Sequence, residues 1–95
     1  VNDMTAVGAL NTVKGMGFRV PDEISIVGFT DGLVSSVTDP LLTTVCQHGF
    51  EIGKKATEIL VKRICEDCDS IIPITEIVKT ELVVRNSTKK LLGVV

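Results

Sequence analysis

The alternation of apolar and polar positions along this chain predicts helices and strands in turn. Apolar residues recur at helical spacing over 3–16 and over 49–66, and the second segment carries opposite charges four residues apart on its other side. Strand-like runs lie at 24–28, 42–46 and 74–84; the first is almost wholly apolar, and the third alternates. The order helix, strand, strand, helix, strand is typical of an α/β fold.

Two polar residues, Thr30 and Asp31, follow three and four positions after the end of the apolar run at Val27. Ligands of open α/β sheets bind outside the carboxyl ends of the strands, which makes these two side chains candidate ligand contacts. Asn2 stands at the start of the first helix, where an Asn is an ordinary N-cap and can also face a ligand. Asp3 is a second possible cap, and Asp31 can equally be an ordinary loop acid.

Length and composition limit the chain to at most one small soluble domain. It has 95 residues, of which 44% are apolar and 23% are charged, and no apolar run approaches the length of a membrane span. Its net charge is −2 with scattered Lys and Arg, so nucleic-acid binding by this segment itself is not expected. Because it starts at Val1 without a Met, we expect a fragment of a longer protein.

The cysteines and the single histidine do not predict a metal site. Cys46, His48, Cys65 and Cys68 are potential zinc ligands, but a helix over 49–66 would separate His48 from Cys65 by about 26 Å. We interpret them as reduced structural thiols in a reducing compartment, and His48 as a residue of the helix start. No nucleophile elbow or dinucleotide-binding glycine motif is present, so no catalytic residue, metal or cofactor is predicted.

Taken together, five motifs resemble the lactose-repressor/galactose-repressor family of bacterial transcription regulators. They are Asn2-Asp3-x-x-Ala6-x-Gly8-Ala9-Leu10, Gly17-x-x-Val20-Pro21-Asp22-x-Ile24-Ser25-Ile26-Val27-Gly28-Phe29, Leu42-Thr43-Thr44-Val45-x-Gln47, Gly53 with Ala56, and Glu81-Leu82-Val83-x-Arg85-x-Ser87-Thr88. The resemblance implies a periplasmic-binding-protein-like (type I) fold, of which this chain would be part of the C-terminal subdomain, a Rossmann-like α/β sheet flanked by helices. Residues 1–85 would form this effector-binding and dimerisation subdomain, and 86–95 a C-terminal tail.

The resemblance also implies roles for particular residues. Asn2 matches a cleft Asn of the family, whereas the acid that usually follows Gly-Phe/Tyr is replaced by Thr30, with Asp31 next; these three are the expected effector contacts. An aromatic that some sugar-binding members carry is Gly49 here. The family's two-fold pairing implies a dimer surface that includes Val7, Leu33, Val34, Val37 and Thr38. Independently, the apolar residues of 33–37 lie in a loop without a periodic core face, so they either form an exposed patch or fold back on the core.

The expected protein is therefore a cytoplasmic, homodimeric regulator that senses a small polar effector, such as a sugar, and binds operator DNA through a helix-turn-helix domain outside this segment. A fragment of a periplasmic sugar-binding protein for transport or chemotaxis is the alternative. The free cysteines and the family motifs around 42–47 and 82–88 favour the regulator.

Overall fold

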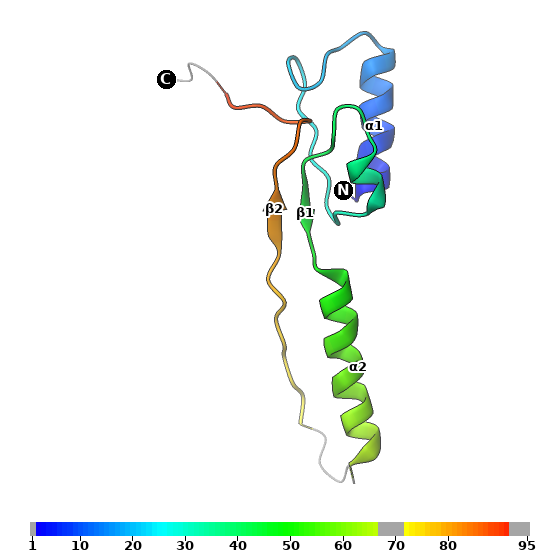
Figure 1. The fold of residues 1–95 in the computed structure, drawn as a ribbon, viewed down its shortest axis with the longest axis vertical. Helices are drawn as coiled ribbons and strands as arrows, with labels where there is room; N and C mark the ends of the chain where they lie inside the picture. Colours follow the sequence, from blue (N-terminus) through cyan, green and yellow to red (C-terminus); the bar gives the residue numbers. More distant parts are fainter. Residues whose placement is uncertain (1, 67–71, 92–95) are drawn as a thin grey trace.

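The computed structural model describes residues 2–66 and 72–91. The elements follow in the order α1 (Asp3–Gly15), a short 3-10 helix η1 (Leu33–Ser36), β1 (Thr44–Cys46), α2 (Gly49–Cys65) and β2 (Glu81–Val83) (Figure 1). Both predicted helices are confirmed to within a residue at each end. None of the helices in these two ranges is long and apolar enough to cross a bilayer.

The first helix contributes its apolar face to the core, and a side-chain cap fixes the residue at which the helix begins. Asn2 caps α1 by accepting a hydrogen bond from the Thr5 amide at 2.9 Å. One turn further on, Ala6 and Leu10 are fully buried. They pack with Ile26 and Leu42 into a small cluster, which partly buried apolar residues surround: Val13, Val20 and Ile24.

The sheet is shorter than the sequence predicts. β1 and β2 pair antiparallel with Val45 opposite Leu82. The segment before η1 runs parallel to β1 through two isolated bridges, Val27 to Thr43 and Thr30 to Cys46. The predicted strand 24–28 is therefore wrong as a regular strand, in part because the amide of Ile24 bonds back to the carbonyl of Arg19 in a turn.

The other two predicted strands are also trimmed. Within 42–46 only residues 44–46 are strand, and within 74–84 only 81–83 are strand. A strand needs a neighbour for its backbone groups, and residues 72–80 have no ladder partner among the described residues. Local alternation identified the extended backbone correctly but not the length of the pairing.

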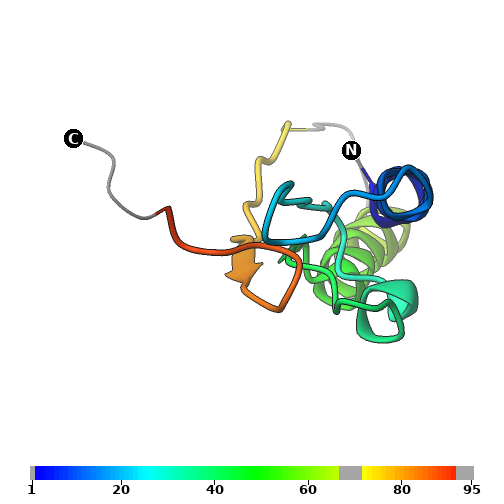
Figure 2. The same cartoon turned by 90° about the horizontal axis from the view of Figure 1, so that it is seen from above.

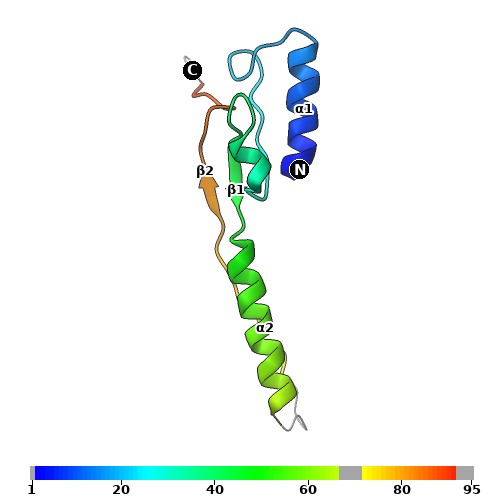
Figure 3. The same cartoon turned by 45° about the vertical axis from the view of Figure 1, so that its right-hand side comes forward.

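α2 projects away from this core and buries none of its residues. Its amphipathic stripe is nevertheless present: Ile52, Ala56 and Ile59 line a hollow of about 260 Å³ against the extended segment that holds Glu76 and Val78. Figures 1 and 3 show α2 continuing the long axis of the molecule, whose extents are 61 × 32 × 16 Å. Seen along that axis, α1 and η1 lie on one side of the strands, and the C-terminal segment runs off the other side (Figure 2).

The chain does not leave the domain at Asn86, contrary to the sequence expectation. Ser87 is fully buried; its Oγ donates to the Ile26 carbonyl at 2.6 Å and accepts from the Thr43 amide at 2.8 Å. The Thr88 and Thr43 hydroxyls share a hydrogen bond of 2.9 Å. The end of the predicted tail, 92–95, lies outside the described residues, as do Val1 and Cys68.

Candidate functional site

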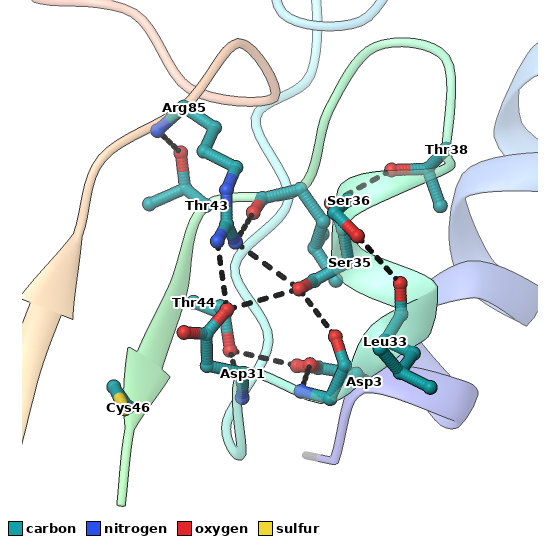
Figure 4. A network of polar contacts seen from close by, with 12 residues as sticks. Asp3, Asp31, Leu33, Ser35, Ser36, Thr38, Thr43, Thr44, Cys46 and Arg85 are labelled. Carbon is teal, nitrogen blue, oxygen red and sulfur yellow. Dashed lines mark hydrogen bonds and ion pairs between the residues drawn. The ribbon is translucent and has the colours of Figure 1, made fainter. Parts of the chain in front are cut away.

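The start of α1 meets the turn at 30–32 and β1 at a single buried carboxylate. Asp3 is 3% exposed, and its two oxygens serve two different segments. Oδ2 accepts from the Gly32 amide at 2.8 Å, and Oδ1 accepts from the Thr44 hydroxyl at 2.7 Å (Figure 4). Asn2, the preceding residue, is exposed. The structure thus brings the helix cap and the exit of the bridge segment together.

The turn itself has an unusual backbone. Thr30 has φ 154° and Asp31 has φ 60°, so two successive residues with side chains occupy positive φ. A β-branched residue in this region is an outlier, and such strain persists only where surrounding contacts fix it. Three consecutive amides are in fact held: Thr30 by the Val45 carbonyl at 2.9 Å, Asp31 by the Thr44 hydroxyl at 3.2 Å, and Gly32 by Asp3.

The Asp31 side chain belongs to an ion pair with Arg85. Its Oδ1 lies 2.8 Å from Arg85 Nη2 and 3.0 Å from the Ser35 hydroxyl. Arg85 Nη1 donates to Ser35 Oγ at 3.1 Å and to the Leu42 carbonyl at 3.0 Å (Figure 4). The hydrogen bond from Arg85, with a smaller one from Ser35, holds the pKa of the Asp31 carboxyl below its ordinary value of 3.8. At neutral pH this carboxylate is ionised and turned into the network.

The three predicted effector residues therefore have different surroundings. Asn2 and Thr30 are both exposed, whereas the side chain of Asp31 is only 20% exposed and is bonded to Arg85. Sequence reasoning missed Arg85, Ser35 and Thr44 as partners; it considered Asp3 as a helix cap, alone or together with a ligand contact, and not as a link between α1, the turn and β1. Arg85 carried one usable signal: it is a charged residue directly after an alternating strand.

The predicted dimer residues lie along α1 and η1. Leu33 is 91% and Val37 77% exposed, so these two side chains do not fold back on the core. Val7, Val34 and Thr38 are half-buried beside them. Of the three apolar residues in this loop, Leu33 and Val37 are thus exposed and Val34 is half-buried, and the dimer contact stays a prediction.

Cys46 and His48 lie close together where β1 gives way to α2. Cys46 Sγ is 3.7 Å from His48 Nδ1, and His48 Nε2 is 3.8 Å from Glu81 Oε2. In the two described ranges, no three His, Cys, Asp or Glu side chains are grouped so that they could hold a metal ion. Cys65 is an exposed free thiol at the end of α2.

Comparison with known proteins identifies relatives along almost the whole chain. Residues 1–88 match the periplasmic binding protein-like domain family. The HTH-type transcriptional repressor PurR of Haemophilus influenzae is 35% identical over 92 residues, which are 96% of this chain and 27% of that protein. The arabinose metabolism transcriptional repressor of Geobacillus stearothermophilus is 40% identical over 91 residues, 95% of this chain and 24% of the relative. The chain thus spans about a quarter of the length of these relatives.

Solved structures agree with this match. A LacI-type transcription regulator from Bifidobacterium animalis superimposes with a TM-score of 0.84 at 32% identity, covering 93% of this chain and 31% of its own. The transcriptional regulator CelR in complex with cellobiose gives 0.83 at 30% identity, covering 92% and 26%. The chain therefore belongs to the periplasmic binding protein-like domain family, as part of an effector domain of the lactose-repressor/galactose-repressor type.

Proposed function

We propose that this chain is part of the effector domain of a bacterial transcription regulator that senses a small polar molecule, in the first instance a sugar. The observation that carries the proposal is the identity of 35–40% to repressors over at least 95% of the chain. The net charge of −2 supports placing operator recognition outside this segment, in a helix-turn-helix domain of the whole protein.

The proposed effector rim consists of Asn2, Thr30 and Asp31. The Asn2 amide and the Thr30 hydroxyl each can donate and accept hydrogen bonds, as neighbouring sugar hydroxyls require. We assign direct contact to these two exposed residues. Asp31 takes part through the turn that it fixes, because its Oδ1 is bonded to Arg85 and Ser35.

The rim covers one side of an effector, so the rest of the cleft comes from chain outside these residues. Small-molecule sites bury about 70–90% of the ligand surface, which two exposed side chains cannot do. An effector that binds both halves better when they are closed shifts the population toward closure, and only that difference in affinity can change DNA binding. This chain supplies part of the effector-binding and dimerisation subdomain in this scheme.

A regulator in the cytoplasm is favoured over a periplasmic transport protein. Relatives at 35–40% identity are named as transcriptional repressors, and one carries arabinose metabolism in its name. Cys46 and Cys65 are free, as is usual in a reducing compartment.

The experiment uses the full-length protein with labelled DNA from upstream of its own gene. Binding is followed by fluorescence anisotropy while pentoses, hexoses and disaccharides are added, including L-arabinose and cellobiose. We expect binding to this DNA and a change of about 10-fold or more in its Kd with one sugar class. Unrelated DNA of equal length and composition is the control. A protein that binds neither this DNA nor any of the sugars would contradict the proposal.

A further inference from the structure

We propose that Arg85 and Asp3 are positioning residues of the effector site: together they hold 30–32 in a strained turn and thereby fix where Thr30 stands at the rim. The inference rests on the proposed function for the meaning of the rim, but the clamp itself is a property of the unliganded protein. Neither residue needs to touch the effector.

The first argument is that the turn is fixed from several sides. Positive φ at Thr30 costs free energy that a free loop would release by rearranging. Here the bonding partners of the three amides come from β1 and from α1, two elements separated in sequence from the turn. The turn can rearrange only if these bonds break.

Asp3, the first residue of α1, links the turn to β1 because its carboxylate accepts a hydrogen bond from each of them. Gly32 bonds one oxygen and Thr44 the other, so moving α1 would disturb both the turn and β1. Gly28 leaves the space for this carboxylate: a Cβ at that position would overlap the Asp3 Oδ1 and come within 2.9 Å of Leu42 Cδ2. The absence of a side chain at Gly28 thus leaves room for the buried Asp3 carboxylate.

Arg85 closes the clamp from the C-terminal side. Its guanidinium reaches Asp31, Ser35 and the Leu42 carbonyl, while its own amide donates to Thr43 Oγ1 at 2.9 Å. The planar fork of Arg suits several acceptors at once, and the single ammonium of Lys cannot reproduce it. By drawing the Asp31 carboxylate inward, Arg85 keeps Asp31 in its left-handed conformation and leaves the preceding Thr30 exposed.

The first test measures amide hydrogen exchange in the full-length protein without effector. In Arg85→Gln we expect the amides of 30–32 to exchange at least 10-fold faster while those of Ala6 and Leu10 keep their rates; Arg85→Lys should lie between. Arg19→Gln is the matched control, since it removes the exposed Arg19–Glu23 pair of 3.0 Å. Unchanged exchange at 30–32, or an equal increase at Ala6 and Leu10, would overturn the clamp.

The second test measures sugar affinity by calorimetry for the same variants and for Asp31→Asn. Asp31→Asn keeps the shape of the side chain, and it takes the place of Arg85→Gln if that variant does not fold. With whichever sugar of the panel binds the unaltered protein, we expect affinity to fall about 10-fold in Arg85→Gln and in Asp31→Asn but not in Arg19→Gln. Unaltered affinity in both clamp variants would refute the positioning role. If no sugar binds the unaltered protein, the proposed sugar sensing fails, and the exchange rates still decide whether the clamp exists.

Discussion

Asp31 is a predicted effector contact whose carboxylate is bonded within the protein, to Arg85 and Ser35. It stands where a sheet of this class presents polar groups, yet its Oδ1 is 2.8 Å from the Arg85 guanidinium. A hydrogen bond to a charged partner contributes about 1.5–3 kcal/mol when partly shielded from water. The left-handed backbone of Asp31 is therefore stabilised by its own side chain, and the exposed group that remains is the hydroxyl of Thr30.

The ion pair gives the protein a defined dependence of stability on pH. Because the folded pKa of Asp31 is below its ordinary value of 3.8, the pair adds stability above that value and loses it as pH falls through the folded pKa. We expect Asp31→Asn to lower the urea midpoint at pH 7. The difference from the unaltered protein should shrink below about pH 4.

A matched variant distinguishes the Asp31–Arg85 ion pair from the general effect of protonating carboxylates at low pH. Asp39→Asn removes an exposed carboxylate outside the Asp31–Arg85 pair and serves as the control. A difference between Asp31→Asn and the unaltered protein that stays constant from pH 7 to pH 3 would rule out the ionised pair.

At the scale of elements, helices could be predicted well and strands poorly, for a physical reason. A helix bonds within itself, so the Asn2 cap and the spacing of Ala6 and Leu10 locate α1 from local sequence. A strand bonds to another segment, so its length depends on partners that local alternation does not reveal. Residues 74–80 belong to the predicted strand 74–84 but have no ladder partner in the described part of the chain.

The residues of the candidate site also differ in how far local sequence predicts them. Asn2 and Thr30 could be proposed as site residues from their places at a helix cap and just past the run that ends at Val27. The Arg85–Asp31 pair could not, because 54 residues separate its partners and several acids stand near loops. The dual use of Asp3 depends on how α1, the turn and β1 pack, which periodicity does not describe.

Gly28 offers a test of this packing. Gly28→Ala would place a methyl group against the Asp3 carboxylate and Leu42, so something must shift. Crowding of this kind costs about 1–3 kcal/mol, and we expect a corresponding fall in stability by urea denaturation together with faster amide exchange at Gly32.

Gly8→Ala is the matched control, since Gly8 lies on α1 with nothing within 4 Å of an added Cβ. It should raise stability by about 0.5–1 kcal/mol through helix propensity alone. If the two variants were equally stable, the close approach at Gly28 would not be a feature of the folded protein.

At the level of the whole molecule, the rest of the described chain leaves α2 uncovered. No residue of α2 is buried, and Phe50 and Ile64 on it are 82% and 72% exposed. The chain spans about a quarter of the length of its repressor relatives. We therefore expect chain outside these 95 residues to cover part of α2 in the whole protein.

The patch at η1 is the proposed two-fold contact of the whole protein. A C₂ interface buries the same patch on both subunits, and Leu33 and Val37 stand out from the surface. In the full-length protein we expect Leu33→Asp with Val37→Asp to shift sedimentation from dimer to monomer at micromolar concentration. Their exposure means that the subunit itself should keep its fold, as circular dichroism would show.

Leu91→Asp is the control for this experiment, because Leu91 is 80% exposed in the C-terminal segment, far along the chain from η1. It should remain dimeric. A double variant at 33 and 37 that still sediments as a dimer would place the contact elsewhere.

Calorimetric titration of the full-length protein with the sugar panel, comparing Thr30→Val with Thr12→Val, tests whether Thr30 contacts the effector. The first replacement removes the rim hydroxyl and keeps the branched shape; the second removes a hydroxyl that donates to the Gly8 carbonyl of its own helix at 2.8 Å. We predict sugar binding by the unaltered protein, a loss of about 10-fold in affinity for Thr30→Val, equivalent to about 1.4 kcal/mol, and no loss for Thr12→Val. Sugar binding that is equally tight in both variants would contradict the assignment of Thr30 to the effector site.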